Sequence, residues 1–107
     1  MKYKKVKKKA LKIYCDNTDK IENEQLWEYI LNSAKDFGLK GATVYKAVAG
    51  IGSTQTIHRF DLLTLSSTMP IVIEIIEDED ILNNFLDSLS LDIKDIYAIM
   101  YDVEVLE

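Results

Sequence analysis

Cysteine, histidine and proline each occur once in this 107-residue chain, and glycine occurs only four times. A single cysteine, Cys15, cannot form an internal disulfide, so we predict a reducing, cytoplasmic environment. The lack of a cysteine cluster or a histidine pair excludes the usual transition-metal sites, and no metal is expected. No apolar run approaches the roughly 20 residues that cross a bilayer, and no secretory signal pattern is present. The length and the hydrophobic fraction of 48% indicate one ordinary globular domain over residues 1–107.

Charge is distributed unevenly along the chain. Residues 1–60 carry 12 Lys and Arg against 6 Asp and Glu, whereas residues 61–107 carry 1 against 12. Six of the lysines fall within residues 1–9, which we interpret as a basic, flexible N-terminal arm. Such an arm could bind nucleic acid or an anionic membrane. Because the whole chain is acidic and the arm has no aromatic residue except Tyr3, we favour an arm that balances the acidic remainder, and nucleic acid is not the expected partner.

The stretch of residues 38–52 connects the predicted elements. Gly38 follows an apolar pattern typical of a helix that starts near residue 23 or 24 and ends at Phe37, and it suits the left-handed position that ends a helix. Residues 42–49 then alternate as a strand with apolar side chains on both faces, so we predict a strand covered on both sides. Gly50 and Gly52 end this strand and open a polar loop.

The remaining segments complete an alternating order. Strands are predicted at residues 10–15, 71–76 and 97–105, and residues 60–65 are a further short candidate. Pro70 can occupy the first position of a strand, and Asp78 can cap a second helix. The order strand, helix, strand, strand, helix, strand predicts an α+β, ferredoxin-like βαββαβ fold, in which an antiparallel sheet carries two helices on one face.

The strand at residues 71–76 is apolar on both faces. One face receives Ile71, Ile73 and Ile75, and the other receives Val72, Glu74 and Ile76. Since the helices cover only one face, the second should be polar in a monomer. We therefore predict that another subunit covers this face in a closed, cyclic oligomer.

Glu74 is the single acid within this apolar run. A carboxylate among isoleucines could bind a ligand or sense protons with a raised pKa. It could equally be an acid near the sheet's edge that pairs with a lysine of a neighbouring strand or subunit. The strand pattern does not decide between these interpretations.

The loop after Gly50 is the strongest candidate for a binding segment. Glycine-flanked backbone amides and a guanidinium can hold a phosphate or a carboxylate. The polar side chains of the loop that we predict to contact a ligand or partner are Ser53, Thr54, Thr56, His58 and Arg59. A long polar loop in a compact domain usually has a function, although a mobile hairpin connection is the simpler alternative.

No set of catalytic residues is recognisable. Catalysis would require a nucleophile with an activating base, a carboxylate pair or a metal site, and we therefore predict that the protein is not an enzyme. Cys15 is predicted to be a small, buried, unreactive residue. Trp27, Phe37 and Phe85 are predicted to be core aromatics because they lie at helical spacing.

Four segments carry a resemblance to a known family. They are residues 11–14 (Leu-Lys-Ile-Tyr), 38–44 (Gly-Leu-Lys-Gly-Ala-Thr-Val), 50–52 (Gly-Ile-Gly) and 70–77 (Pro-Ile-Val-Ile-Glu-Ile-Ile-Glu). Together they resemble the P-II-like family of uncharacterised small prokaryotic proteins, which is itself similar to the nitrogen-regulatory P-II signalling proteins. The resemblance covers nearly all of the chain from Ala10. It implies a ferredoxin-like fold, a trimer, and a flexible loop, here residues 50–67, that docks onto partners.

The resemblance also implies a ligand site. In P-II proteins a nucleotide lies in the cleft between subunits, and membrane transporters are frequent partners. The residues that match the nucleotide-contacting positions of the P-II pattern are Gly41, Thr43, Gly50, Gly52, Gln55 and Glu74.

The chain also departs from the P-II pattern. P-II proteins have a glycine-rich, lysine-bearing phosphate loop after the second helix and finish with arginines, whereas residues 89–95 here offer Lys94 alone as a cation and the chain ends with Asp102, Glu104 and Glu107. These departures argue against nucleotide binding in the P-II manner, so no cofactor is assigned. We predict a regulator that binds a small ligand at subunit clefts and a partner through residues 50–67; the alternative is a ligand-independent interaction module, for a partner such as a membrane transporter.

Overall fold

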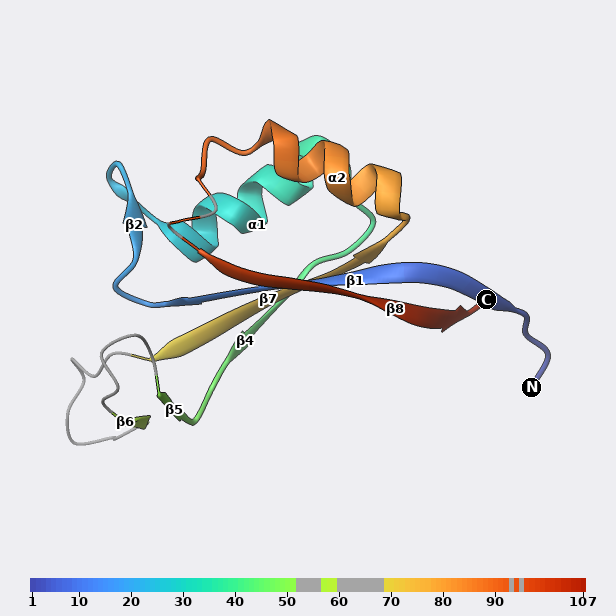
Figure 1. Ribbon diagram of the computed structural model, residues 1–107, viewed down its shortest axis with the longest axis horizontal. Coiled ribbons are helices and arrows are strands. Elements are labelled where there is room, and N and C mark those ends of the chain that lie inside the picture. The colour runs from blue at the N-terminus through green and yellow to red at the C-terminus, as the bar shows by residue number, and fades with distance from the viewer. Residues whose placement is uncertain (52–56, 60–68, 93, 95) are drawn as a thin grey trace.

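The computed structural model describes residues 1–51, 57–59, 69–92, 94 and 96–107. Its main sheet contains the antiparallel strands β1 (Lys5–Asp16), β4 (Thr43–Lys46), β7 (Pro70–Glu77) and β8 (Tyr97–Leu106) in the order β4-β7-β1-β8. Within the described residues, helices α1 (Leu26–Phe37) and α2 (Glu79–Ser88) lie together on one face of this sheet (Figure 1). The predicted ferredoxin-like α+β fold is therefore confirmed. None of the described helices is long and apolar enough to cross a membrane.

The core forms between this helical layer and one face of the sheet. Ile73 of β7 lies opposite Ile13 of β1, and Ile75 lies opposite Leu11, so four large apolar side chains form the floor of the core. The helices close it with Leu26, Ile30, Ala34, Leu82 and Phe85. The odd-numbered isoleucines of β7 therefore face the helices, because side chains alternate across a strand. Pro70 is the first residue of β7, as predicted.

The start of α1 differs from its prediction, whereas its end does not. A small hairpin of β2 (Lys20–Ile21) and β3 (Glu24–Gln25) occupies the expected first turn, and the connecting Glu22 has a φ of 54°. The helix therefore begins at Leu26. At its end Gly38 has a φ of 91° and its N–H reaches the carbonyl of Lys35 at 3.1 Å. Gly38 is thus the left-handed terminating glycine that the sequence predicts.

The strand predicted at residues 42–49 is shorter and more exposed than expected. It divides into β4, which is an edge strand, and β5 (Ala49–Ile51), which pairs with β6 (Ile57–Arg59) in a separate two-stranded sheet. Val48, between the two strands, is 80% exposed. Within one chain only the helix side of β4 is covered, since Val44 packs against the core whereas Tyr45 on the other side is 51% exposed. Cover on the second side stays a prediction that depends on another subunit. The candidate strand at residues 60–65 lies outside the described residues.

The N-terminal segment also differs from its prediction. β1 begins at Lys5 and pairs with β8 as far as Leu106, and the backbones of Lys4 and Glu107 form two hydrogen bonds of 2.8 and 2.9 Å. Residues 5–9 are therefore strand rather than a separate flexible arm. The reason lies in the other end of the chain, since Asp102 and Glu104 stand opposite Lys9 and Lys7 and neutralise the lysines that would otherwise repel one another.

Cys15 packs against the core, and its burial, followed by the nearby Asp19 and Asp16, raises the pKa of its thiol to about 12. Because only the thiolate is nucleophilic, we expect iodoacetamide at pH 8 to modify Cys15 at least about 100-fold more slowly in the folded protein than in the urea-unfolded chain. Mass spectrometry over a time course measures both rates. Equal rates in the two states would contradict the half-buried position of this thiol.

Candidate functional site

The face of the sheet that lies away from the helices carries mainly apolar and aromatic side chains. We call this surface the open face. It is formed by Thr43 and Tyr45 of β4, Val72, Glu74 and Ile76 of β7, Lys12 and Tyr14 of β1, and Tyr97, Ile99 and Tyr101 of β8. Tyr97 is 67% exposed and Tyr45 51% exposed. A contiguous surface of this composition is typical of an interaction site, because isolated soluble domains rarely leave such a patch in water.

One row of the open face contains its only described ion pair. Thr43, Glu74 and Lys12 are successive cross-strand partners, and the Nζ of Lys12 lies 3.9 Å from the Oε2 of Glu74. Both side chains are partly buried. The separation exceeds hydrogen-bond length, so the Glu74 carboxylate keeps the capacity to accept hydrogen bonds from a ligand. The structure thus places Glu74 against a lysine of the neighbouring strand, although β7 is an inner strand and not an edge strand.

Lys12 also contacts the aromatic side of this surface. Its Nζ lies 5.6 Å from the centroid of the Tyr101 ring, within the range of a cation–π contact. The pKa of Lys12 is raised above its ordinary value, first by Tyr101 and to a smaller extent by Tyr14 and Glu74. Lys12 is therefore a fixed positive charge in the middle of the open face at all physiological pH values.

The tyrosines form a second row. Tyr45, Val72, Tyr14 and Tyr97 are consecutive partners across the four strands, and the rings of Tyr14 and Tyr97 meet edge to face at 5.5 Å. Sequence analysis did not single out these tyrosines or Lys12. The sequence pattern that contains them is the alternation of polar or aromatic residues with core residues in β1 and β8. Assigning these side chains to one surface also requires the register between the strands.

The structure brings only part of the predicted ligand site together. Thr43 and Glu74 are direct neighbours, whereas Gly50 lies in β5, beside Pro70 at the start of β7. Pro70 precedes Glu74 by four residues, a separation of about 13 Å along a strand. Gly41 is exposed in the segment before β4. The four candidates that the structure describes therefore do not form a single cluster within one chain, and the grouping implied by the resemblance stays a prediction.

The two described candidate glycines differ in their surroundings. A Cβ added at Gly41 would meet nothing within 4 Å, so packing does not require glycine there. A Cβ added at Gly50 would lie 2.9 Å from the Cγ of Pro70. Real Cβ atoms do not approach that closely, so packing against Pro70 alone accounts for glycine at position 50.

Most of the polar loop lies outside the described residues, including Gly52, Ser53, Thr54, Gln55 and Thr56. His58 and Arg59 belong to β6, where they pair through their backbones with Gly50 and Ala49, and their side chains also fall outside the described part. Phosphate or carboxylate binding by this loop therefore stays a prediction.

Lys94, the one cation after α2, is exposed and lies near an acid. Its Nζ is 3.8 Å from the Oδ2 of Asp92, and its backbone N–H donates to the Oδ1 of the same residue at 3.0 Å. Part of its charge is therefore balanced locally, which weakens it as a phosphate ligand.

The sheet order, the two-helix layer and the uncovered sheet face are those of a PII-like α+β fold. Among solved structures, the chain is similar to the apo form of CPII, a nitrogen regulatory PII-like protein from Thiomonas intermedia K12, with a TM-score of 0.67, 16% identity and coverage of 99% of each chain. A structure of CPII bound to ADP, AMP and bicarbonate gives a TM-score of 0.64, with 18% identity over 95% of this chain and 98% of that one. A putative PII-like signaling protein from Thermus thermophilus gives 0.60, with 21% identity over 96% and 91%.

The sequence comparison identifies the family. The model of DUF190, described as "Uncharacterized ACR, COG1993", matches residues 8–105. A UPF0166 protein of Aquifex aeolicus is 40% identical over 84 residues, which cover 78% of this chain and 80% of the relative. A UPF0166 protein of Methanocaldococcus jannaschii is 38% identical over 84 residues, covering 78% and 77%. The chain therefore belongs to the DUF190/UPF0166 family, which confirms the resemblance seen in its sequence.

Proposed function

We propose that this protein is a trimeric PII-like regulator that binds a small ligand at its subunit clefts and a partner protein through residues 50–67. The observation that carries the proposal is the open face, where Tyr45, Tyr97 and Ile99 would be solvated in a monomer. Antiparallel sheets that expose one face to water carry mainly polar residues there, whereas this face carries mainly apolar and aromatic residues. A cyclic oligomer removes the same face of every subunit from water.

The proposed ligand is an adenine nucleotide or a small anion such as bicarbonate. Support for this class comes from CPII, whose structure holds ADP, AMP and bicarbonate. In this chain Lys12 supplies a positive charge beside Glu74 and Thr43, and a neighbouring subunit would add groups that one chain does not bring together. The departures after α2 and at the C-terminus favour a mono- or diphosphate over a triphosphate, because Lys94 is the only cation there and Asp92 partly neutralises it.

Replacing Ile99 with lysine tests the oligomer. Ile99 lies between Tyr97 and Tyr101 on the open face, so an added charge would have to be buried without a partner in the trimer. We expect Ile99→Lys to be a monomer of about 12.3 kDa in light scattering at micromolar concentration, and the native protein to have three times that mass. Asn83→Lys, an exposed position on α2, adds the same charge on the helical side and should leave the trimer intact. A native protein of monomer mass would refute the proposal.

Thermal-shift measurements test the ligand. ADP, AMP and bicarbonate are added separately, and a ligand present at 100 times its dissociation constant should stabilise the fold by about 2.7 kcal/mol. Glu74→Gln is the variant to compare with the native protein in this measurement, since it keeps the shape of the side chain and removes its charge. If none of these compounds raises the midpoint temperature of unfolding, the proposal that the protein senses an adenine nucleotide or bicarbonate is excluded. Loss of partner capture on deleting residues 53–59, without any ligand effect, would then support a ligand-independent interaction module.

A further inference from the structure

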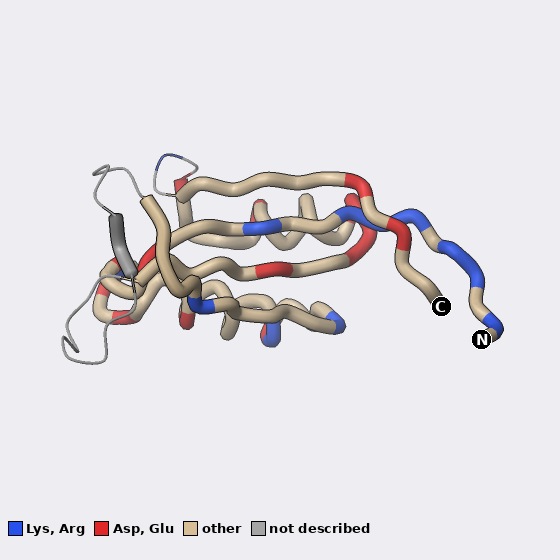
Figure 2. Tube along the Cα trace, turned by 90° about the horizontal axis from the view of Figure 1, so that it is seen from below, with Lys and Arg blue, Asp and Glu red and all other residues tan. Residues whose placement is uncertain are grey.

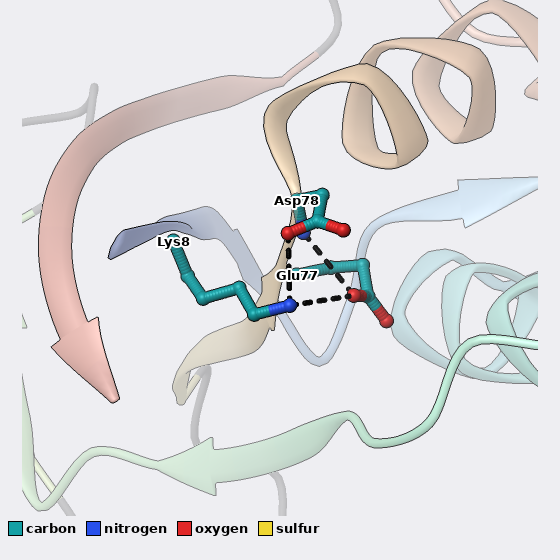
Figure 3. A network of polar contacts seen from close by, with 3 residues as sticks. All are labelled: Lys8, Glu77 and Asp78. Atoms are coloured by element: carbon teal, nitrogen blue, oxygen red, sulfur yellow. Dashed lines mark hydrogen bonds and ion pairs between the residues drawn. The ribbon is translucent and has the colours of Figure 1, made fainter. Parts of the chain in front are cut away.

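The two ends of β7 are held by different side chains. Where β7 ends, the Nζ of Lys8 donates to the Oδ1 of Asp78 at 2.8 Å and lies 3.9 Å from the Oε1 of Glu77, which is 5% exposed (Figure 3). Asp78, predicted to cap α2, is its N-cap residue but makes no side-chain capping bond and contacts Lys8 instead. The two chain termini project from the same end of the molecule, where basic and acidic stretches of the chain run side by side (Figure 2).

The opposite end of β7 meets the turn that follows β1, residues 16–19, which we call the β1 turn. The Oδ1 of Asp16 accepts the backbone N–H groups of Thr18 at 2.7 Å and of Asp19 at 3.1 Å, and the Oδ2 of Asp19 accepts the N–H of Asp16 at 2.9 Å. The carbonyl of Asp19 accepts the N–H of Leu26, the first residue of α1, at 2.8 Å. The β1 turn is therefore attached both to the sheet and to the helical layer.

Asn17, within the β1 turn, adds one pair to the ladder between β1 and β7. Asp16 lies opposite Pro70 in the register, so the next pair is Asn17 and Met69. The N–H of Asn17 donates to the carbonyl of Met69 at 3.1 Å, as in a regular antiparallel pair. The N–H of Met69 donates in return to the side-chain Oδ1 of Asn17 at 2.8 Å, where a regular pair uses the backbone carbonyl. The amide oxygen of an asparagine side chain can take this place, so pairing continues where the backbone already turns.

Residues 69 and 70 are in this way joined to three parts of the fold. Met69 is 4% exposed, so water has little access to replace its bond to Asn17. The carbonyl of Pro70 accepts the N–H of Ala47, which lies between β4 and β5, at 2.9 Å. Gly50 of β5 lies beside the ring of Pro70. The point where the chain enters β7 is therefore fixed by the β1 turn, the β4–β5 connection and β5 together.

We propose that Asn17 is the positioning residue that fixes where the proposed partner-binding segment, residues 50–67, returns to the sheet. Its side chain holds Met69, two residues after the end of that segment, and the β1 turn connects this contact to the start of α1. The inference rests on the proposed function for the role of residues 50–67, but not for the contact itself. Although Asn17 lies outside this segment, its replacement should release the segment's returning end.

Amide hydrogen exchange followed by NMR tests this role. In Asn17→Ala the N–H of Met69 loses its acceptor, so we expect it to exchange at least about tenfold faster than in the native protein. Asn17→Asp keeps an acceptor oxygen and should restore the rate to within about threefold of the native value. The amide of Ile73, a fully buried residue in the middle of β7, should exchange at the native rate in both variants.

Two further variants separate this contact from its surroundings. Lys8→Met removes the ion pairs at the other end of β7 and should leave the exchange of Met69 unchanged. Asp16→Ala removes the acceptor that shapes the β1 turn, and we expect it to accelerate the exchange of Met69 by at least about threefold. No effect of Asp16→Ala would refute the connection between the β1 turn and Met69.

Unchanged exchange of Met69 in Asn17→Ala would overturn the proposal. Equal acceleration at Met69 and Ile73 would overturn it as well, because that result indicates a general loss of stability. So would fast exchange in Asn17→Asp, since the acceptor oxygen would then not be what holds Met69. The proposed function fails separately: if deleting residues 53–59 leaves partner capture unchanged while Asn17→Ala still releases Met69, the contact stands and the partner-binding role does not.

Discussion

Replacing Phe85 with alanine is expected to lower the free energy of unfolding by about 3–5 kcal/mol, the usual cost of deleting a buried aromatic ring. Phe85 is fully buried in the core between α2 and the sheet, and it meets the ring of Phe37 edge to face at 5.6 Å. Since a domain of this size has a total stability of about 5–15 kcal/mol, this single change should remove a large share of it.

Phe37→Ala is the matched control for this measurement. The ring of Phe37 is 41% exposed and touches the same partner from the edge of the core. We expect its loss to cost about 1 kcal/mol, which is near the worth of one aromatic pair plus partial burial. Urea unfolding at a single protein concentration compares the two, because oligomerisation makes stability depend on concentration. Equal destabilisation by both variants would show that α2 does not bury Phe85 as described.

Replacing Gly50 with alanine is expected to destabilise the protein by about 1–3 kcal/mol, because the new methyl group would overlap Pro70 and force a backbone shift. Pro70 starts β7, and its carbonyl accepts the N–H of Ala47 at 2.9 Å, so the shift would disturb the point where β4, β5 and β7 meet. Urea unfolding again provides the measurement. A neutral effect would mean that residues 47–51 move freely relative to β7.

Gly41→Ala separates the structural role of glycine from a role in ligand binding. This position has open space around it. The substitution should leave stability unchanged or raise it by about 0.4–1 kcal/mol, because alanine reduces the conformational entropy of the unfolded chain. A loss of ligand affinity in Gly41→Ala would therefore support close approach of a ligand to the backbone. The same loss in Gly50→Ala would not, because that variant is also expected to be destabilised.

Local sequence patterns predicted most of the elements. The β-branched run of β7 and the glycine after α1 are strong local signals, and both were confirmed. The strand predicted at residues 42–49 was confirmed only over Thr43–Lys46, because the alternating pattern continues through the residues that separate β4 from β5. The lysines before Ala10 were assigned to an arm because their partners, Asp102 and Glu104, lie at the other end of the chain.

The candidate site was less predictable than the fold. Pairing of Glu74 with a lysine of a neighbouring strand was one of two interpretations, but the sequence did not identify that lysine, because Lys12 lies 62 positions away. The rows of the open face depend on which residue of β1 meets which residue of β7 and β8. A shift of one residue in either pairing would move every side chain to the opposite face.

The order of the elements and the apolar character of both faces of β7 followed from the sequence alone, because periodicity and turn residues act over a few neighbouring positions. The family followed from the resemblance of four short segments. The tertiary structure was needed to see that β1 and β7 are the inner strands, that Lys12 pairs with Glu74, and that the two ends of the chain pair as neighbouring strands. These features depend on the register between strands distant in the sequence, which is set by the packing of the whole sheet against α1 and α2.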